Sequence, residues 1–573
     1  MSRDNVLCPR AVQDLIADGH IIVIYDEYVL KLDSWLERHP GGSLAILHMV
    51  GKDATDEINA YHKPPTLKTM KAFRIGRKPP GIWTNATPPI RGGVYVKEPE
   101  EKPVVESTIP TDVSDAEDSS VLETSFSDLS ESRSTGTAPT SEDSCGEDLE
   151  ETTIERMGET DGQTFRFRSA KKIYVGKKDP LAFTTWAEKQ DEARDILEYP
   201  SVDPAVQQDI VKKYRELHEK VYELNLYDCP YIEYAKEMCR YTTLFVASMT
   251  ALYNQWYLTS AFFLGLFWHQ IMFVAHDAGH RAITGNFVID SLIGMFVADF
   301  CCGLSIGWWK SSHNVHHLIT NMPEHDPDIQ NVPIFATSPS FFRSLHSTYY
   351  DFTFIWDAAA NFLVPFQKYT YYPVMGIARF NLYLLSWLHV LSSKASSLGS
   401  SKAWWIRPAE IAMMSCYWYI FGYLLLWCTL PSWPVRIGFV LVSHIVTMPL
   451  HVQITLSHWA MSTSDLGESE SFPQRQLRTT MDVDCPAWLD FIHGGLQFQA
   501  VHHLFPRVPR HNLRKVQTLV KQFCAETNIP YVLLSFEDGN KKVLNRLQEV
   551  GDQVEHLINC QKYMAATGES GLH

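Results

Sequence analysis

Long apolar runs in the second half of the chain constrain its fold more than any other feature. About 20 apolar residues in a helix cross the roughly 30 Å hydrocarbon core of a bilayer. Residues 242–275 are long enough for two short, closely coupled helices, and 409–430 and 435–460 form a second pair around the turn Pro-Ser-Trp-Pro. We therefore predict an all-α, multi-pass membrane domain with about four crossings.

Two further apolar stretches leave a count of six crossings open. Asp290 and Asp299 interrupt the run 286–306. Carboxylates are costly inside a spanning helix, so we expect this run to be buried or interfacial. Residues 351–365 are ambiguous, and we do not count them among the four.

The acidity of the chain is confined to one segment. Residues 98–161 hold 20 Asp and Glu against 3 Lys and Arg, a net charge of −17, whereas the whole chain carries −16. Such a polar segment buries too little apolar surface to offset its chain entropy. We therefore divide the chain into a small soluble domain (1–80), an acidic disordered linker (81–165), an amphipathic pre-membrane region (166–240) and a membrane domain with a cytosolic C-terminal cap (241–573).

The N-terminal domain carries two histidines, His39 and His62, at the ends of the stretch "HPGGSLAILHMVGKDATDEINAYH". Two imidazoles on turns or helix ends can hold a haem iron from opposite faces, which leaves no open position and suits electron transfer. Gly41 and Gly42 would let the backbone pass close to the macrocycle. On these residues alone, a helix-start turn with an unrelated histidine is an equal alternative.

The whole N-terminal domain resembles the cytochrome b5 family, including "DEYVLKLDSWLERHPGG" and "GKDATDEI". The resemblance implies a small α+β domain that binds haem b. It also implies that His39 and His62 are the axial ligands of the haem iron.

Three groups of polar residues lie beside the apolar runs, each with members at positions i, i+3 or i+4. They are His276 and His280; His313, His316 and His317; and Gln499, His502 and His503. Residues with this spacing share one face of a helix. Neutral imidazole binds iron, copper and zinc, and seven histidines exceed the four ligands of a tetrahedral zinc. We therefore predict a site for two metal ions, although any single pair could be an ordinary core or surface pair.

The predicted topology puts all three groups on the same side of the membrane. The N-terminal domain has no secretory signal, so we expect it in the cytosol. Two crossings before His276 return the chain to the cytosolic side, and two more precede Gln499. Four or six crossings therefore both allow one shared metal centre.

Residues 230–530 resemble the membrane fatty-acyl desaturase and hydroxylase superfamily, in which three histidine boxes hold two non-haem irons. In front-end desaturases fused to cytochrome b5, the third box reads QxxHH, as it does from Gln499 to His503. The resemblance implies that the three groups bind iron and that His458, in "ITLSHWAM", is a further ligand. Gln499 would act as a weak oxygen ligand or as a hydrogen-bond partner of water at the iron.

Other polar residues near the boxes have roles that the sequence leaves open. His325, His451 and His493 are as consistent with structural roles as with metal binding. Asp277 and Asp326 can orient imidazoles by accepting the second ring N–H, an arrangement common around metal sites.

The boxes look most similar to those of sphingolipid Δ8 desaturases, and the acidic insertion looks like that of the fungal members. The resemblance implies an enzyme that uses O2 to introduce a trans C8=C9 double bond into the long-chain base of a ceramide or sphingolipid. It also implies electrons from an NADH-cytochrome b5 reductase-type donor, relayed by the fused haem domain, in the endoplasmic reticulum membrane, with the haem domain and the boxes on the cytosolic side. No nucleic-acid partner is expected.

Three other functions remain open. A front-end acyl desaturase of the Δ5 or Δ6 type would use the same site. A fatty-acid hydroxylase has a different histidine spacing and lacks QxxHH. A non-enzymatic haem redox carrier would leave the three histidine groups without a role.

Overall fold

The computed structural model describes residues 3–97, 180–392 and 403–567. Most of the predicted linker, from residue 98 to residue 165, lies outside the described residues. Residues 1–97 and 176–573 fall in one compact unit. The start of the predicted linker, 81–97, is packed on the N-terminal domain: Trp83 is buried and donates a hydrogen bond to the carbonyl of Gly51 at 3.1 Å.

The N-terminal domain is a small α+β fold around a three-stranded antiparallel sheet. Its strands β1 (Ile22–Tyr25), β2 (Tyr28–Lys31) and β3 (Arg74–Arg77) pair in the order β1-β2-β3. Its helices are α1 (Pro9–Ala17), α2 (Ser43–Leu47), α3 (Thr55–Tyr61) and α4 (Pro64–Met70). All of β1 is buried, because α1 packs on one face of the sheet and α2 on the other. This agrees with the predicted fold of the domain.

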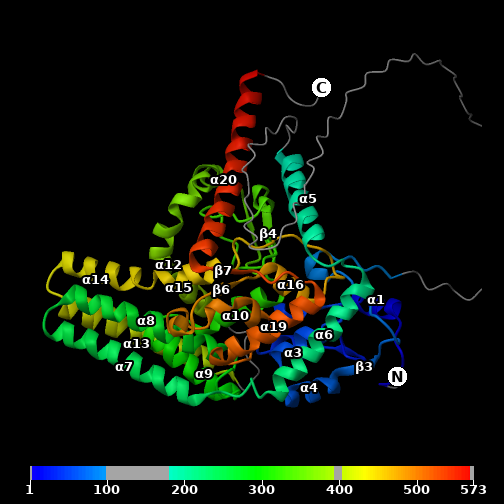
Figure 1. Cartoon of the computed structure of the whole chain (residues 1–573), viewed down its shortest axis with the longest axis horizontal. Helices are drawn as coiled ribbons and strands as arrows, with labels where there is room; N and C mark the ends of the chain where they lie inside the picture. Colours follow the sequence, from blue (N-terminus) through cyan, green and yellow to red (C-terminus); the bar gives the residue numbers. More distant parts are fainter. Residues whose placement is uncertain (1–2, 98–179, 393–402, 568–573) are drawn as a thin grey trace, which may run out of the picture. The chain divides into compact units, whose positions relative to one another are not determined.

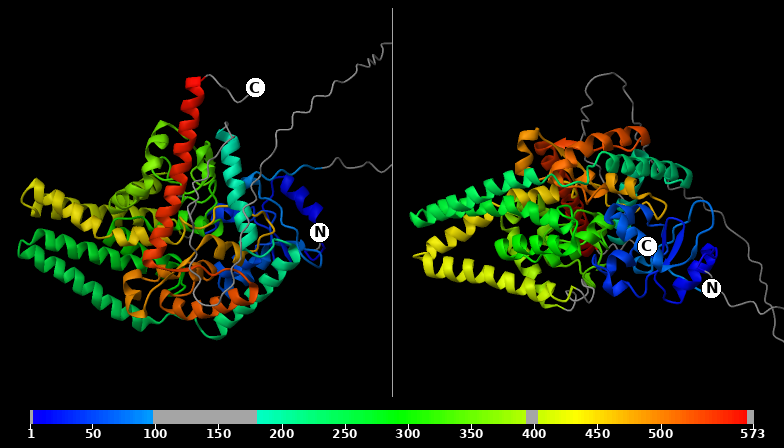
Figure 2. Two further views of the ribbon diagram at one scale, coloured as in Figure 1. Left: turned by 45° about the horizontal axis from the view of Figure 1, so that its top comes forward. Right: turned by 90° about the horizontal axis from the view of Figure 1, so that it is seen from below.

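Two helical hairpins form the apolar part of the second domain. The first joins α7 (Tyr231–Tyr253) to α8 (Tyr257–Gly279), and the second joins α13 (Ile406–Trp418), with its π-helical continuation over Tyr419–Thr429, to α14 (Trp433–Ile445) and α15 (Met448–Leu456). Figures 1 and 2 show α7, α8, α13 and α14 extending in the same direction, side by side. Trp268, Phe421 and Phe439 are buried in the core between them.

Within the described residues, four helical segments are long and apolar enough to cross a membrane. They are Tyr257–Gly279, Ala358–Leu391, Ile406–Thr429 and Trp433–Leu456. The number agrees with the prediction, but one member differs. Charged residues in the first half of α7, such as Lys236 and Arg240, remove that helix from the set. Residues 358–391, which comprise α11 (Ala358–Leu363) and α12 (Gln367–Leu391), take its place.

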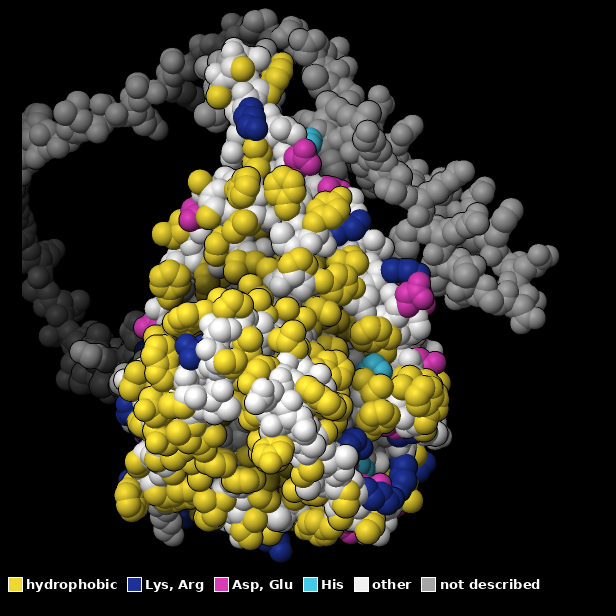
Figure 3. Space-filling view, turned by 90° about the vertical axis from the view of Figure 1, so that its left-hand side faces the viewer, with side chains coloured by type: hydrophobic (Ala, Val, Ile, Leu, Met, Phe, Trp, Pro, Cys, Tyr) yellow, Lys and Arg dark blue, Asp and Glu magenta, His cyan; other side chains and the backbone are white. Residues whose placement is uncertain are grey.

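The hairpins expose apolar side chains to their surroundings. At least 40% of the surface is exposed on four such residues of these helices: Phe245, Phe262, Leu424 and Ile437. Figure 3 faces the ends of the hairpins and shows hydrophobic side chains over most of this face, with few charges. A continuous apolar face of this kind is unusual in soluble proteins and suits contact with lipid. The chain is therefore a membrane protein.

The run 286–306, predicted to be buried or interfacial, is partly buried: Asp290, Met295 and Asp299 are buried, whereas Val288, Leu292 and Phe296 are 46–50% exposed. Both carboxylates accept hydrogen bonds from the backbone, although Oδ2 of Asp299 has no partner among the described residues. The run forms α9 (Phe287–Met295) and a π-helical turn over Phe296–Cys301, and the chain then bends by 115° into α10 (Ile306–Leu318). Asp290 accepts hydrogen bonds from the backbone of Thr284 and Gly285. Asp299 accepts one from the N–H of Ile306 at 2.8 Å.

The remaining elements lie outside the two hairpins. They are α5 (Pro180–Glu198), α6 (Pro204–Glu223), α16 (Phe472–Thr479), α17 (Asp490–His493), α18 (Gln499–Leu504), α19 (Leu513–Thr527), α20 (Phe536–Thr567), the antiparallel pair β4 (Leu345–Ser347) and β5 (Phe352–Phe354), and the parallel pair β6 (Asp482–Asp484) and β7 (Leu533–Ser535). The core between α6, α18 and α19 includes Tyr214, Val501 and Val516.

Candidate haem and metal centres

His39 and His62 face each other in the N-terminal domain. Their ring centroids are 6.0 Å apart. His39 precedes the Gly41-Gly42 turn and donates through Nδ1 to the carbonyl of Gly42 at 2.9 Å, while His62 ends α3 and donates through Nδ1 to the carbonyl of Ile58 at 2.9 Å. These bonds fix the tautomer in which Nε2 carries the lone pair.

The pair fits a haem iron. A metal ion between the two rings would form a bond of about 2 Å to the near nitrogen of each ring. Two such bonds, together with the radii of the two rings, span about the observed distance between the centroids. Burial lowers the pKa of His39, and it lowers the pKa of His62 to about 3. Both imidazoles are therefore neutral near pH 7, which is the form that binds iron.

The three histidine groups converge from separate helices. His276 and His280 lie at the end of α8, and α10 presents the second group. Ser305 caps α10 by accepting from the N–H of Trp308, and it donates to Glu410 of α13 at 2.8 Å. These bonds fix where α10 begins and therefore the direction in which its histidines point.

The third group lies on α18, which has six residues. The chain enters α18 through Gly494, whose φ is +60°, and a Cβ there would lie 2.1 Å from the ring of Phe273. Glycine is therefore required at this close approach. The N–H of Ala500 donates to the carboxylate of Asp482 at 2.8 Å, which holds the start of the helix.

The converging histidines form two groups that could each hold one metal ion. The first group is His276, His280, His313 and His502; the second is His316, His458 and His503. Within each group the ligand atoms lie within 4.8 Å of one another. His458 follows α15 in the chain, and its ring centroid lies 4.6 Å from that of His316 and 4.9 Å from that of His503.

His317 lies between the two groups. Its ring stacks on His503 at 4.0 Å, and its Nε2 is 3.0 Å from the Nε2 of His313. The structure therefore brings together every histidine of the three boxes and His458, and Gln499 shares the short helix α18 with His502 and His503.

Many polar atoms in this centre are buried without a hydrogen-bond partner among the described residues. They are Nε2 of His276, His280, His502 and His503, Nδ1 of His317 and His458, and Oε1 of Gln499. Burial also holds the pKa of His502 and His503 well below the usual range, so these rings are neutral. Unpaired buried polar atoms are costly, and a metal ion would satisfy those nitrogens. The donor set is therefore suited to metal ions.

Two side chains orient the clustered histidines. As predicted, Asp326 accepts from Nδ1 of His316 at 2.8 Å. Gln476 of α16 accepts from Nδ1 of His503 at 2.8 Å and donates to the carbonyl of His317 at 2.8 Å. No sequence pattern singles out Gln476, because this residue lies outside the boxes and has no metal-ligand spacing.

We expect Asp326→Asn to lower metal content or activity roughly 10–100-fold, the usual effect of losing a group that orients a ligand. Asp326 accepts from His316 and from the N–H of Asn321 on one oxygen, and from the N–H of Asp328 on the other. The asparagine side chain has only one acceptor oxygen, and its NH2 group would face one of the N–H donors that Asp326 now accepts from. Metal analysis of purified protein measures the effect. Asp328→Asn is the control and should cost less, because that carboxylate lies 3.8 Å from His316; equal losses would contradict the prediction.

The second predicted orienting residue, Asp277, has a different role. Its carboxylate lies 3.6 Å from Nδ1 of His276, too far for a hydrogen bond. Asp277 instead pairs with the buried Arg510 and accepts from Tyr234. Arg510 also pairs with Glu237 of α7 and donates to the carbonyl of Phe273 at 2.9 Å. The prediction for Asp277 was wrong because Arg510, far away in sequence, competes for its carboxylate.

We expect Arg510→Met to destabilise the fold by about 3–5 kcal/mol, because it leaves two carboxylates buried without their cation. Thermal unfolding in detergent measures the loss. Arg514→Met is a matched control one turn further on: Arg514 pairs with Asp490 where both side chains are about one third exposed, and such pairs contribute only about 0–1 kcal/mol. Similar shifts in both variants would contradict the account.

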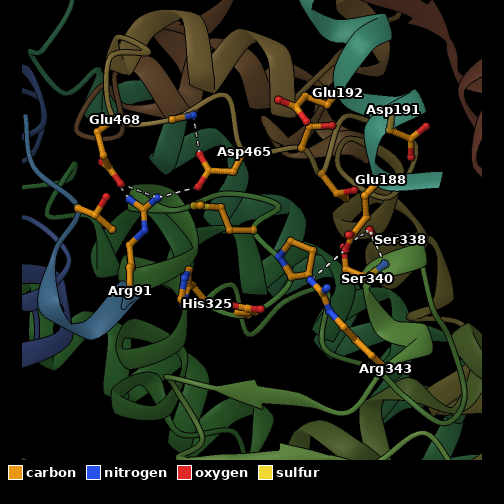
Figure 4. Close-up of a pocket in the computed structure, with 17 residues that line it drawn as sticks. Arg91, Glu188, Asp191, Glu192, His325, Ser338, Ser340, Arg343, Asp465 and Glu468 are labelled. Carbon is orange, nitrogen blue, oxygen red and sulfur yellow. Dashed lines mark hydrogen bonds and ion pairs between the residues drawn. The ribbon is translucent and has the colours of Figure 1, made fainter. Parts of the chain in front are cut away.

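The other histidines lie outside the two metal groups. His451 donates to the carbonyl of Met375, and His493 donates to Gln453. His325 lines a separate polar cavity of about 350 Å³, which none of the clustered histidines lines. Figure 4 shows His325 near Arg91, whose guanidinium pairs with Asp465 and Glu468. The surroundings of these three histidines therefore favour structural roles over metal binding.

Two family models match the chain. Residues 9–78 match the cytochrome b5-like haem/steroid binding domain, and residues 254–535 match the fatty acid desaturase family. The matched regions contain the facing pair of histidines and both metal groups, respectively. Together they define the class of the protein: a membrane desaturase with an N-terminal cytochrome b5-like domain.

Three relatives are similar to the chain, two of them over essentially its full length. A Delta 8-(E)-sphingolipid desaturase of Emericella nidulans is 47% identical over 580 residues, covering 100% of this chain and 99% of the relative. The enzyme of the same name from Candida albicans is 44% identical, covering 96% of each. A Delta(8)-fatty-acid desaturase of Helianthus annuus is 36% identical, covering 58% of this chain and 70% of the relative. The chain belongs to the family of the Delta 8-(E)-sphingolipid desaturases.

Proposed function

We propose that this chain introduces a trans double bond between C8 and C9 of the long-chain base of a ceramide or related sphingolipid. The convergence of the three boxes and His458 into two metal groups carries the proposal. Similarity over essentially the full length of the Emericella nidulans and Candida albicans enzymes supports the substrate. The reaction converts two CH2 groups and O2, with two electrons and two protons, into a CH=CH group and two water molecules.

We propose that His39 and His62 hold haem b. The two metal groups, together with His317, would hold two non-haem irons, with Gln499 beside them as an oxygen ligand or a hydrogen-bond partner. Bound iron would supply the oxygen activation that an unactivated C–H bond requires. The protein itself orients the ligands, through Asp326 and Gln476, and excludes bulk water, because most of the clustered histidines are buried.

The cellular setting is part of the proposal. The chain would lie in the endoplasmic reticulum membrane, with the haem domain and the boxes on the cytosolic side. An NADH-dependent reductase of the cytochrome b5 reductase class would supply the electrons. The acidic segment 98–165 would act as a linker between the haem domain and the membrane domain.

Expression in a yeast that lacks Δ8-unsaturated sphingoid bases tests the proposal, with His502→Ala as the inactive control. Mass spectrometry should find a base two hydrogens lighter, with a trans double bond mapped to C8, that is absent in the variant. Unsaturated acyl chains with unchanged bases would instead indicate an acyl desaturase. A base heavier by one oxygen would indicate a hydroxylase. Either result would overturn the assignment.

A further inference from the structure

The haem-ligand loops of the N-terminal domain lie against α10, the helix that carries the second box. Leu44, at the start of α2, packs with Val315 and Ile319 of α10. Asn314 Nδ2 donates to the carbonyl of Gly41 at 3.4 Å. The loop that presents His39 therefore touches the helix that presents the proposed iron ligands.

The segment that presents His62 is also held by the membrane domain. Arg507, four residues after His503, donates through Nε to the carbonyl of Ala60 at 2.9 Å and through Nη2 to the hydroxyl of Tyr222 at 2.7 Å. Arg215 of α6 pairs with Asp56 of α3 at 2.7 Å. On another side, the buried Lys52 pairs with Glu468 at 2.8 Å. These bonds fix the end of α3 relative to the histidine boxes.

Tyr61 lies at the centre of this contact. It directly precedes His62, and its ring meets the ring of His317 edge to face, with centroids 6.1 Å apart and planes at 88°. Its hydroxyl is buried and has no hydrogen-bond partner among the described residues. A buried tyrosine usually finds a partner for its hydroxyl, so hydrogen bonding does not account for this side chain. Its ring packs against two apolar cores and also contacts the ring of His317.

Among the described residues, Tyr61 is the only aromatic or histidine residue of the haem domain whose ring contacts one of the clustered histidines, which are those of the two metal groups and His317. His48 contacts the ring of His325, which belongs to the separate polar cavity. The route from His62 to His317 therefore consists of one peptide link, the side chain of Tyr61 and one ring contact. Electron transfer slows steeply as gaps between groups lengthen, so this short route favours transfer.

We infer that Tyr61 is the contact through which electrons pass from the haem to the metal centre. This inference rests on the proposed function. Each transfer would move one electron from ferrous haem held by His39 and His62, leaving it ferric, to the metal centre that the histidine groups would hold. Two transfers supply the two electrons of the reaction, and the reductase restores the ferrous haem each time. The role of Tyr61 is one of positioning and coupling, since it touches a ligand and not the substrate.

Stopped-flow absorbance of the purified holoenzyme tests the inference. The haem is reduced, mixed with O2 and a ceramide, and followed as it reoxidises in a single turnover. We expect Tyr61→Ala to slow the substrate-dependent phase by about tenfold or more. Tyr61→Phe and Tyr61→Trp keep an aromatic ring and should retain close to the wild-type rate. If the alanine variant loses haem or unfolds, Tyr61→Leu replaces it in the comparison. Leucine also removes the aromatic ring but leaves a smaller cavity.

A second readout needs no turnover. Hydrogen exchange of Thr55–Tyr61 and Ile306–Leu318 reports whether the haem domain stays docked, and the haem reduction potential reports on the haem pocket. In the alanine variant we expect both to match the wild type, because Arg507, Arg215 and Lys52 still hold the domain.

The outcomes are distinct. Wild-type transfer rates in both the alanine and leucine variants would overturn the inference, as would a phenylalanine variant as slow as alanine. Slow transfer with raised exchange across both segments would assign Tyr61 to docking and also overturn it. A wild-type haem whose reoxidation does not depend on the lipid would show that the proposed function itself is wrong.

Discussion

Replacing His458 by alanine is expected to abolish desaturation as completely as replacing a histidine of the boxes. His458 lies outside the boxes in sequence, yet the structure groups it with His316 and His503. The second group has only three histidines, so the loss of one removes a third of its nitrogen donors. Even orienting partners of ligands contribute roughly 10–100-fold, so we expect a loss of more than about 100-fold, accompanied by loss of non-haem iron.

His444→Ala is the matched control for this experiment. His444 lies in the candidate spanning segment that ends two residues before His458 and is also buried, but it stacks on Phe380 and donates to the carbonyl of Val440. Removing it creates a cavity without removing a metal ligand. Sphingoid-base analysis and iron content should therefore separate the two variants. Full iron and activity in His458→Ala would remove His458 from the ligand set.

Replacing His62 by alanine is expected to remove the haem and to stop product formation while the non-haem iron remains. The two rings face each other at 6.0 Å, and an iron held from both faces loses one of its two axial nitrogens in the variant. The metal groups draw no ligand from the N-terminal domain. The haem absorbance band and the iron content, measured on the same purified sample, check both parts of the prediction.

His20→Ala serves as the comparison for His62→Ala. His20 belongs to the same domain but is partly exposed and bonded to Asp33, so its loss should leave the haem in place. A His62 variant that keeps a full complement of haem would contradict the proposed ligation. One that loses haem yet makes product at the wild-type rate would contradict electron relay by this domain.

Local patterns in the sequence were enough to predict most of the fold and the histidines at the centre of the site. Histidines at i, i+3 and i+4 must share a helix face, and the apolar runs must end near one side of the bilayer, so convergence of the boxes followed from geometry. The second hairpin, α13 to α15, was recognisable because its apolar runs are long. The first hairpin was harder, since the charges of Lys236 and Arg240 make the start of α7 polar.

Tertiary contacts account for what the sequence did not reveal. Gln476 orients His503 from a helix that has no motif, and Arg510 takes the carboxylate of Asp277 from 233 residues away. Trp83 shows that the N-terminal domain extends past residue 80, where composition alone predicted linker. The contact between Tyr61 and His317 joins two domains. None of these contacts has a periodic or spaced signature.

The iron and haem content of the purified wild-type protein tests the central claim most directly. Total iron by mass spectrometry and haem by absorbance are measured per chain on one sample. The account predicts one haem and about two further irons per chain, with the further irons lost when both His316 and His502 are replaced by alanine. One iron per chain, all of it in haem, would contradict the two-metal centre on which the proposed desaturation depends.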